Sequence, residues 1–172
     1  MAVLPILTAP DPRLKAKAKR VEKVDAEIRR LMDDMLETMY AAPGIGLAAP
    51  QVGALVRVVV IDIGKTEADR NPLFMANPEI VEVSEDDNTY EEGCLSVPTH
   101  YAEVVRPRQV KVRFLDHQNE IRELEADGLM ATCIQHEMDH LDGVLFIDRI
   151  SSLKRNMILR KLVKTKKEEA AV

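Results

Sequence analysis

The chain carries Gln135-His136-Glu137-Met138-Asp139-His140-Leu141 at the end of a predicted helix over 129–141. Residues four apart in a helix lie on one face, so His136 and His140 can bind a single metal ion. Glu137 can reach a water molecule at that ion without binding the ion itself. Apolar side chains recur at helical spacing and predict that the helix is buried: Met130, Cys133, Ile134, Met138 and Leu141.

The remaining elements are strands in the middle of the chain and helices at both ends. Their predicted positions are a helix from Asp25 to just before Pro43, strands over 57–63, 73–83 (broken at Pro78) and 103–115, a hairpin partner over 121–126, and a last helix over 152–167. Gly143 is the expected end of the helix that carries the histidines. This order favours an α+β fold, with antiparallel β-sheets packed around a central metal-binding helix and further helices at the N- and C-terminus. We expect residues 1–172 to form a single catalytic domain.

Composition excludes several classes of protein. Of 172 residues, 46% are hydrophobic, which is too many for a disordered chain with a net charge of −5. The apolar runs are too short to cross a bilayer, so we expect no membrane association through a spanning helix. Two cysteines do not make a disulfide scaffold, and Met1–Pro5 lacks the features of a secretory signal. We therefore expect a cytoplasmic protein whose thiols stay reduced.

Charge is unevenly distributed along the sequence. Residues 153–172 contain seven basic and two acidic side chains, a net charge of +5, whereas residues 1–152 contain 17 and 27, a net charge of −10. A basic C-terminal segment on an acidic body indicates an anionic partner. A solvated amphipathic helix that packs Leu153, Met157, Leu162 and their neighbours on the body is the alternative, and both interpretations can hold together.

Two histidines leave a third metal ligand to be found. The candidates are acidic side chains together with Cys94, Cys133, His100 and His117. Cys133 lies in the apolar stripe of the helix, which favours a role in packing. Cys94 lies in the extended segment 91–98, where a rigid backbone can present a thiolate. One Cys and two His with an open fourth position form a catalytic arrangement.

The segment Gly44-Ile45-Gly46-Leu47-Ala48-Ala49-Pro50-Gln51 contains the pattern G-x-G-x-x-A. A dinucleotide fingerprint follows a strand and opens a helix, whereas this segment follows a helix and soon meets Pro50. We therefore expect no nucleotide cofactor. The glycines allow the backbone to approach a bound peptide closely, and Gln51 offers an amide donor.

Three strings together resemble the signature motifs of the peptide deformylase family: Gly44–Gln51, Glu92-Gly93-Cys94-Leu95-Ser96 and Gln135–Leu141. They stand in the family's order, and the similarity extends over residues 4–165. The resemblance implies a hydrolase that removes the formyl group from the N-terminal formylmethionine of new polypeptides and releases formate. Its substrates are then N-formyl-methionyl peptides.

The resemblance also implies a metal and a base. In the family the matching residues bind one divalent ion, which here means Cys94, His136 and His140. The implied ion in the cell is Fe²⁺, and Zn²⁺, Ni²⁺ or Co²⁺ can occupy such a site. Glu137 matches the family's general base and acid.

Further roles follow from the same motifs. Gln51 and the backbone N–H of Leu95 match the groups that stabilise the oxyanion in the family. Tyr101 departs from the pattern, because some bacterial members carry an arginine at this place that contacts the substrate backbone. The residues implied in the methionine pocket are Ile45, Gly46, Leu129 and Cys133.

Two other functions fit parts of the sequence. A zinc peptidase shares the H-E-x-x-H string alone and would cleave an internal peptide bond. A non-catalytic binding module stapled by a metal would have a closed site and a dispensable Glu137. We further expect a monomer whose basic tail, residues 153–172, contacts ribosomal RNA near emerging chains.

Overall fold

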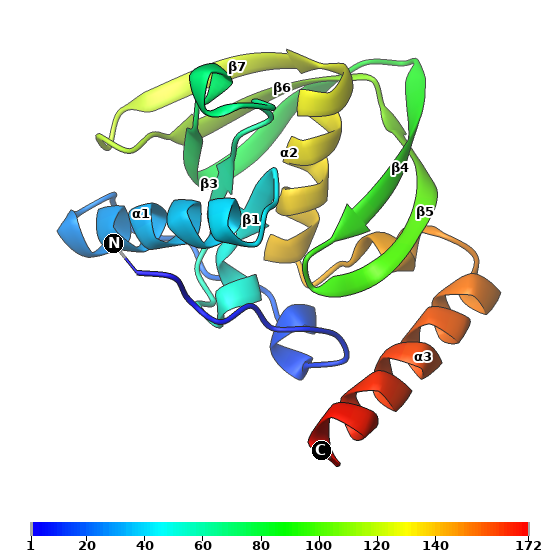
Figure 1. Cartoon of the computed structure of the whole chain (residues 1–172). Coiled ribbons are helices and arrows are strands. Elements are labelled where there is room, and N and C mark those ends of the chain that lie inside the picture. Colours follow the sequence, from blue (N-terminus) through cyan, green and yellow to red (C-terminus); the bar gives the residue numbers. More distant parts are fainter. Residues whose placement is uncertain (1, 172) are drawn as a thin grey trace.

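The computed structural model describes residues 2–171 and has α2 at its centre (Figure 1). The α-helices of this part of the chain are α1 (Ala26–Ala41), α2 (Gly128–Leu141) and α3 (Ser152–Ala170). Its strands are β1 (Gly46–Ala48), β2 (Val58–Ile61), β3 (Leu73–Val83), β4 (Asp87–Cys94), β5 (Val97–Pro107), β6 (Gln109–Leu115) and β7 (Ile121–Asp127).

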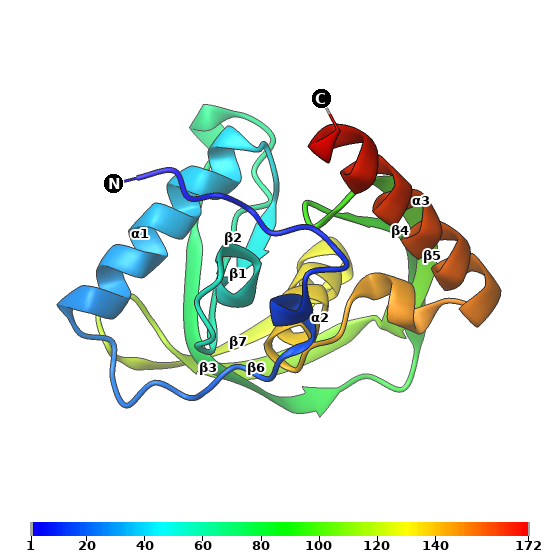
Figure 2. The ribbon, with the colours of Figure 1, turned by 90° about the horizontal axis from the view of Figure 1, so that it is seen from below.

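The strands form two antiparallel sheets on either side of α2. One sheet has the order β1-β2-β3-β6-β7, and the other is the β4–β5 hairpin. Figures 1 and 2 show α2 between them, and the helix contacts strands of both sheets. The predicted α+β fold, with antiparallel sheets around a central helix, is confirmed.

Helix α1 follows the predicted pattern closely. Its N-cap is Asp25, whose carboxylate accepts a hydrogen bond from the Ile28 N–H at 3.0 Å. The fully buried face consists of Met32, Met35 and Met39, which pack against β1 and β2. Burial of this apolar stripe fixes α1 on one side of the molecule, and the chain leaves it directly toward β1.

Helix α2 is packed into the main core of the molecule. Ala131, Ile134 and Leu141 are fully buried among residues of β2, β3 and β6. The helix ends at Leu141 and is closed as predicted by Gly143, which has a φ of 75° and donates its N–H to the His140 carbonyl at 3.1 Å. The histidine-bearing turns of α2 are therefore held by packing on several sides.

Two strand predictions need correction. The predicted strand over 103–115 is two strands, β5 and β6, which belong to different sheets and separate at Arg108. The pairing of β5 with β4 ends at Pro107, opposite Asp87, and the pairing of β6 with β7 begins at Gln109, opposite Asp127. The predicted break at Pro78 is a bulge within a continuous β3, where Asn77 has a φ of 50° and the register with β6 shifts.

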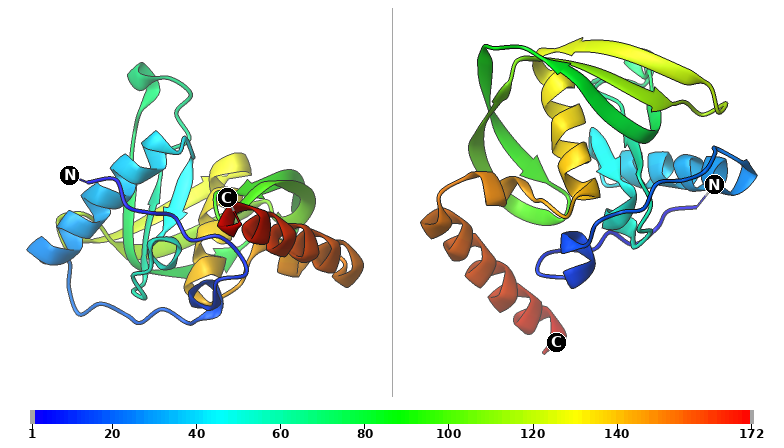
Figure 3. Two further views of the ribbon diagram at one scale, coloured as in Figure 1. Left: turned by 60° about the horizontal axis from the view of Figure 1, so that its bottom comes forward. Right: turned by 180° about the vertical axis from the view of Figure 1, so that it is seen from behind.

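Helix α3 packs on the body through part of the predicted face only. Leu162 is 5% exposed, but Leu153 and Met157 are 68% and 45% exposed, so packing of the latter two was predicted wrongly. Ile158 and Leu159 pack beside Leu162 instead. Figure 3 shows that α3 lies at the periphery, where only one side of the helix meets the body.

Among the described residues, no helix is long and apolar enough to cross a membrane.

Candidate metal centre and active site

A cavity of about 760 Å³ opens between β1, the β4–β5 hairpin and α2. Its walls come from segments that are distant in the sequence and are brought together by the central position of α2. The sequence-predicted residues that line it are Ile45, Gly46, Cys94, Leu95, Leu129, Cys133, His136 and Glu137. All three sequence motifs therefore meet around one space.

Three predicted metal ligands converge beside this cavity. The ligand atoms of Cys94, His136 and His140 all lie within 4.8 Å of one another, and Cys94 Sγ lies 3.3 Å from His140 Nε2. Bonds of about 2.0–2.3 Å to a central ion bring ligand atoms to this kind of separation. Within residues 2–171 this is the one group of three or more such side chains close enough to share an ion. Among the candidates for the third ligand, Cys94 is therefore the residue that lies with the two histidines. The three side chains fit a divalent metal ion.

The remaining candidates lie elsewhere. His117 is paired with Asp33 at 2.8 Å, on the far side of the fold near α1. His100 lines the cavity from β5 but is not part of the converging group. Cys133 packs in the main core, where burial raises the pKa of its thiol to about 12 and keeps it protonated.

A buried chain of charged groups orients His136. Its Nδ1 lies 2.8 Å from Glu92 Oε1, which leaves Nε2 for a metal. Arg106 donates to both oxygens of Glu92 at 2.7 and 2.9 Å, and to Asp139 at 2.9 Å. Arg149 donates to Asp139 at 2.6 and 2.7 Å. Glu92 and Asp139 belong to the second and third motifs, but their role in this chain was not predicted, and no feature of the sequence indicated Arg106.

The environment of these groups shifts their protonation. Burial acts to raise the pKa of Glu92, but hydrogen bonds from His136 and Arg106 outweigh it and lower that pKa. Burial lowers the pKa of His140 well below its ordinary value, so this imidazole is neutral and has a lone pair to donate. Neutral imidazole is the form that binds metals.

Glu137 lies against the glycine segment of the first motif. A Cβ atom at Gly46 would come within 2.5 Å of Glu137 Oε2, so only glycine leaves room for this carboxylate. Oε2 lies 4.0 Å from His136 Nε2, and the buried Oε1 has no hydrogen-bond partner among the described residues. Burial raises the pKa of Glu137 to about 7, although His136 acts to lower it. The carboxylate is therefore buried, beside the metal group and able to exchange a proton near neutral pH.

Gln51 is fixed with one amide N–H toward the metal group. Its Oε1 accepts from the Ala48 N–H at 2.9 Å, and its Nε2 donates to Ser96 Oγ at 3.0 Å and to Cys94 Sγ at 3.4 Å. The N-terminal segment adds a backbone bond from Leu7 to the Gln51 carbonyl at 2.7 Å. The bonds to Ala48, Ser96 and Cys94 determine which way the side-chain amide points.

A cysteine sulfur, two imidazoles on one helix and a buried carboxyl group beside an open cavity define a metal-dependent hydrolase. The sequence profile of the polypeptide deformylase family matches residues 3–156. The chain belongs to this family.

Relatives and solved structures agree over almost the whole chain. The peptide deformylase of Mesorhizobium japonicum is 54% identical over 170 residues, which cover 99% of this chain and 97% of the relative. The peptide deformylase of Phenylobacterium zucineum is 57% identical over 164 residues, which cover 95% of this chain and 97% of the relative. The crystal structure of peptide deformylase from Ehrlichia chaffeensis has a TM-score of 0.93 at 40% identity, covering 98% of this chain and 99% of that one. A structure of peptide deformylase from the same organism in complex with actinonin has a TM-score of 0.90 at 43% identity and covers 96% of this chain and 98% of that one.

The predicted activity is thereby confirmed. The chain is a hydrolase with peptide deformylase activity, which removes the formyl group from N-terminal formylmethionine. Formylated peptides are the substrates that membership of this family implies.

Proposed function

We propose that Cys94, His136 and His140 hold one divalent ion, Fe²⁺ in the cell, and that Glu137 is the general base and acid of deformylation. The observation that carries this proposal is the convergence of the three ligand atoms within 4.8 Å beside the Glu137 carboxylate. A bound ion would acidify water and polarise the formyl oxygen, and mixed thiolate and imidazole ligands suit Fe²⁺, Zn²⁺, Ni²⁺ and Co²⁺.

Glu137 moves the proton in both halves of the reaction. Its carboxylate, which lies 4.0 Å from His136 Nε2, accepts a proton from the attacking water and later delivers that proton to the leaving amine. A pKa of about 7 supports both steps, because a base near the working pH is also a usable acid. The close contact with Gly46 supports a fixed position for this carboxylate.

Gln51 and Leu95 stabilise the charge that forms on the formyl oxygen. The Gln51 amide, held by Ala48 and Ser96, points an N–H toward Cys94 and the metal group. Leu95 directly follows Cys94 in the tight turn between β4 and β5, which supports a role for its backbone N–H as the second donor. One such donor contributes on the order of 3 kcal/mol to the transition state in related sites.

The methionine side chain is received by the apolar wall of the cavity. Ile45 and Leu129 are exposed there although they are large and hydrophobic, which supports contact with an apolar ligand. The edge of β1 at Gly46 pairs with the substrate backbone, because β1 has a neighbouring strand, β2, on one side only. Cys133 closes the pocket as a protonated, packed thiol.

The basic tail contacts ribosomal RNA in this proposal. Leu162 holds α3 on the body, while Lys154, Arg160, Lys161 and Lys164 are exposed. Removing α3 would uncover its apolar contacts. A variant with glutamine at these four positions, which lowers the net charge of residues 153–172 from +5 to +1, is the sharper probe. Wild-type protein should co-sediment with ribosomes at low salt and the variant should not. Equal co-sedimentation of both would contradict the ribosome contact.

We also propose a single catalytic domain that acts as a monomer in the cytoplasm without a nucleotide cofactor. Contact of α2 with both sheets supports one domain. The segment Gly44–Gln51 follows α1 and contains the short strand β1, which is not the strand-to-helix turn of a dinucleotide site. Light scattering on the purified chain measures the oligomeric state, and a stable dimer would contradict the monomer.

The metal and the reaction are tested together by anaerobic purification, metal analysis and a formyl-Met-Ala-Ser assay. We expect about one Fe²⁺ per chain, release of formate and loss of activity in air, because a ferrous site and the Cys94 thiolate are oxidisable. Cleavage of an internal peptide bond without formate would point to a peptidase. Another bound metal with air-stable activity would contradict Fe²⁺ but leave the deformylation intact.

A further inference from the structure

Asp62 is a buried carboxylate that takes no part in the deformylation proposed above. It directly follows β2 and is 3% exposed. Its Oδ2 accepts from the Tyr40 hydroxyl and, at 3.0 Å, from the Asn71 N–H, and its Oδ1 accepts from the Gly64 N–H at 2.9 Å. Burial of a charge is costly unless it is hydrogen-bonded, so these three donors explain how the carboxylate is tolerated. They leave open what it does.

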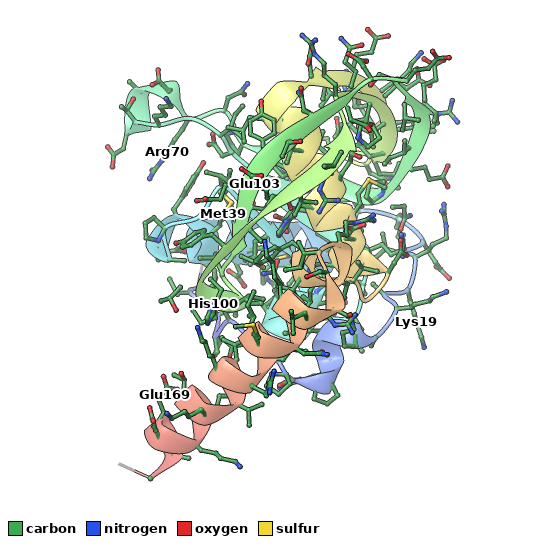
Figure 4. The ribbon with its side chains drawn as sticks, turned by 90° about the vertical axis from the view of Figure 1, so that its right-hand side faces the viewer. Lys19, Met39, Arg70, His100, Glu103 and Glu169 are labelled. Carbon is green, nitrogen blue, oxygen red and sulfur yellow. The ribbon has the colours of Figure 1, made fainter. Side chains whose placement is uncertain are left out.

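The charge of Asp62 makes its bond to Tyr40 a strong one. Burial acts to raise the pKa of Asp62, but its hydrogen bonds, foremost the one from Tyr40, outweigh burial and lower that pKa. Burial raises the pKa of Tyr40 to about 12, so the hydroxyl keeps the proton that it donates. The Arg70 guanidinium carbon lies 3.9 Å from the centre of the Tyr40 ring and covers the pair. Figure 4 labels Arg70 in the loop between β2 and β3, which projects beside α1.

Asp62 holds both ends of a segment of the cavity wall. Its carboxylate binds Tyr40 near the end of α1, and its backbone N–H donates to the Ile45 carbonyl at 2.8 Å. The residues between these two, 41–44, therefore cross from α1 toward β1 with one residue bonded at either end. Residues 42–46 all line the cavity. The position of this wall relative to β2 thus depends on Asp62.

The bond to Ile45 also sets the direction of the Gly46 backbone. Ile45 lies opposite Asp62 and accepts its N–H. The next pair of the ladder is Gly46 with Ile61. Opposite residues of antiparallel strands alternate between hydrogen-bonded and non-hydrogen-bonded pairs, so the N–H and C=O of Gly46 point away from β2. β2 is the one strand paired with β1 among the described residues, so Gly46 presents both groups at a free edge that lines the cavity.

We propose that Asp62 and Tyr40 are positioning residues, which hold the edge of β1 at Gly46 in the register that pairs with the substrate backbone. This inference rests on the pairing of the substrate with that edge proposed above. Without the bond from Tyr40, the segment 41–44 gains freedom to shift relative to β2. An edge with this freedom must be ordered each time a peptide binds, which weakens the pairing. The metal ligands lie on β4 and α2, so metal content should not change.

The test measures how much kcat/KM rises when the substrate is extended from formyl-Met amide to formyl-Met-Ala-Ser. Metal-loaded wild-type protein is compared with Asp62→Asn and with Tyr40→Phe, which keeps the ring under Arg70 and removes only the hydroxyl. The rise should be about tenfold smaller in both variants, as expected for the loss of one hydrogen bond to a charged group. Asp69→Asn is the matched control, because this carboxylate of the same loop is exposed and accepts from Thr66.

Hydrogen exchange gives a readout that does not depend on activity. Mass spectrometry of the metal-loaded protein should show faster exchange over residues 41–48 in Tyr40→Phe than in the wild type, with unchanged exchange in the β6–β7 hairpin. Asp69→Asn should match the wild type in both regions. Unchanged exchange over 41–48 in Tyr40→Phe would overturn the proposal.

The kinetic outcomes separate this inference from the function on which it rests. If the wild type gains nothing from the longer peptide, the backbone pairing proposed above fails, and the positioning role fails with it. If the wild type gains but Tyr40→Phe keeps the whole gain, the pairing stands and only the positioning role is overturned. A fall of kcat/KM by one common factor on both substrates would mean that Tyr40 and Asp62 serve the fold alone. An equal loss of gain in Asp69→Asn would overturn the proposal as well.

Discussion

Arg106 should stabilise the fold through the buried charges that orient His136. The side chain is 3% exposed and makes three charge-assisted hydrogen bonds of 2.7–2.9 Å to Glu92 and Asp139. Arg106→Ala removes the cation and leaves both carboxylates in the interior without it. Breaking a buried ion pair in this way costs about 3–5 kcal/mol of the free energy of unfolding. Arg106→Lys keeps the charge but loses the two-pronged contact with Glu92, so an intermediate loss is expected.

Arg108 provides the matched control two residues along the chain. Its side chain is 50% exposed and its carboxylate partners, Asp127 and Asp86, lie 3.3 and 3.7 Å away. Arg108→Ala should therefore cost less than about 1 kcal/mol. The assay is guanidinium unfolding of metal-free protein followed by far-UV circular dichroism, because the chain has no tryptophan. If the Arg106→Ala and Arg108→Ala proteins unfold with equal free energies, the buried network does not stabilise the fold and the reasoning is wrong.

Three further perturbations test other parts of the structure. Gln51→Ala should lower kcat in a formate-release assay by about 10²–10³ with metal content unchanged, and a loss below threefold would exclude an oxyanion role. In metal-free protein, iodoacetamide should alkylate Cys94 under native conditions and Cys133 only after unfolding, because burial raises the pKa of Cys133 to about 12. Mass spectrometry of the two cysteine-containing peptides measures the labelling, and labelling of Cys133 in the native protein would contradict its packing role. Leu162→Ala should lower the free energy of unfolding by about 2–5 kcal/mol, whereas Met157→Ala, at an exposed position, should lower it little. Chemical unfolding measures both, and equal losses would mean that α3 is not held on the body through Leu162.

Periodic patterns in the sequence were enough to predict the helices. The apolar spacing around Met32, Met35 and Met39 predicted the buried face of α1, and the spacing around Ile134 did the same for α2. These predictions succeeded because an amphipathic helix buries a face that its own residues define, whatever it packs against. For α3 the same kind of spacing predicted burial of Leu153 wrongly, because the body determines which apolar side of a peripheral helix is covered.

The strands were harder to predict from the sequence. β1 is three residues long and has no alternating pattern, and β4 contains mostly polar residues, so neither carries the usual signal. The change of sheet between β5 and β6 occurs at Arg108, inside what is locally one extended run. Only long-range pairing distinguishes two sheets from one strand, and a single sequence contains no direct record of such pairing.

The candidate site was predicted better than the sheets that hold it. Two histidines and a glutamate in one helix impose their own geometry, so His136, Glu137 and His140 needed no tertiary information. Cys94 remained one of several candidates on residue types alone, and convergence within the fold selected it. The role of Arg106 could not be predicted from the sequence, because an arginine in a strand is usually solvated. Nothing in the neighbouring sequence indicates that this one is buried between two carboxylates.

The central claim is that Glu137 moves the proton for formyl removal at a metal held by other residues. The most direct measurement compares formate release from a formyl-Met peptide by wild-type protein and by Glu137→Gln at equal, measured metal content. The variant should bind the metal normally, since Glu137 is outside the converging ligand group, and should lose about 10²–10⁴ in kcat. A Glu137→Gln protein that carries the same metal and releases formate at a near-normal rate would contradict the account.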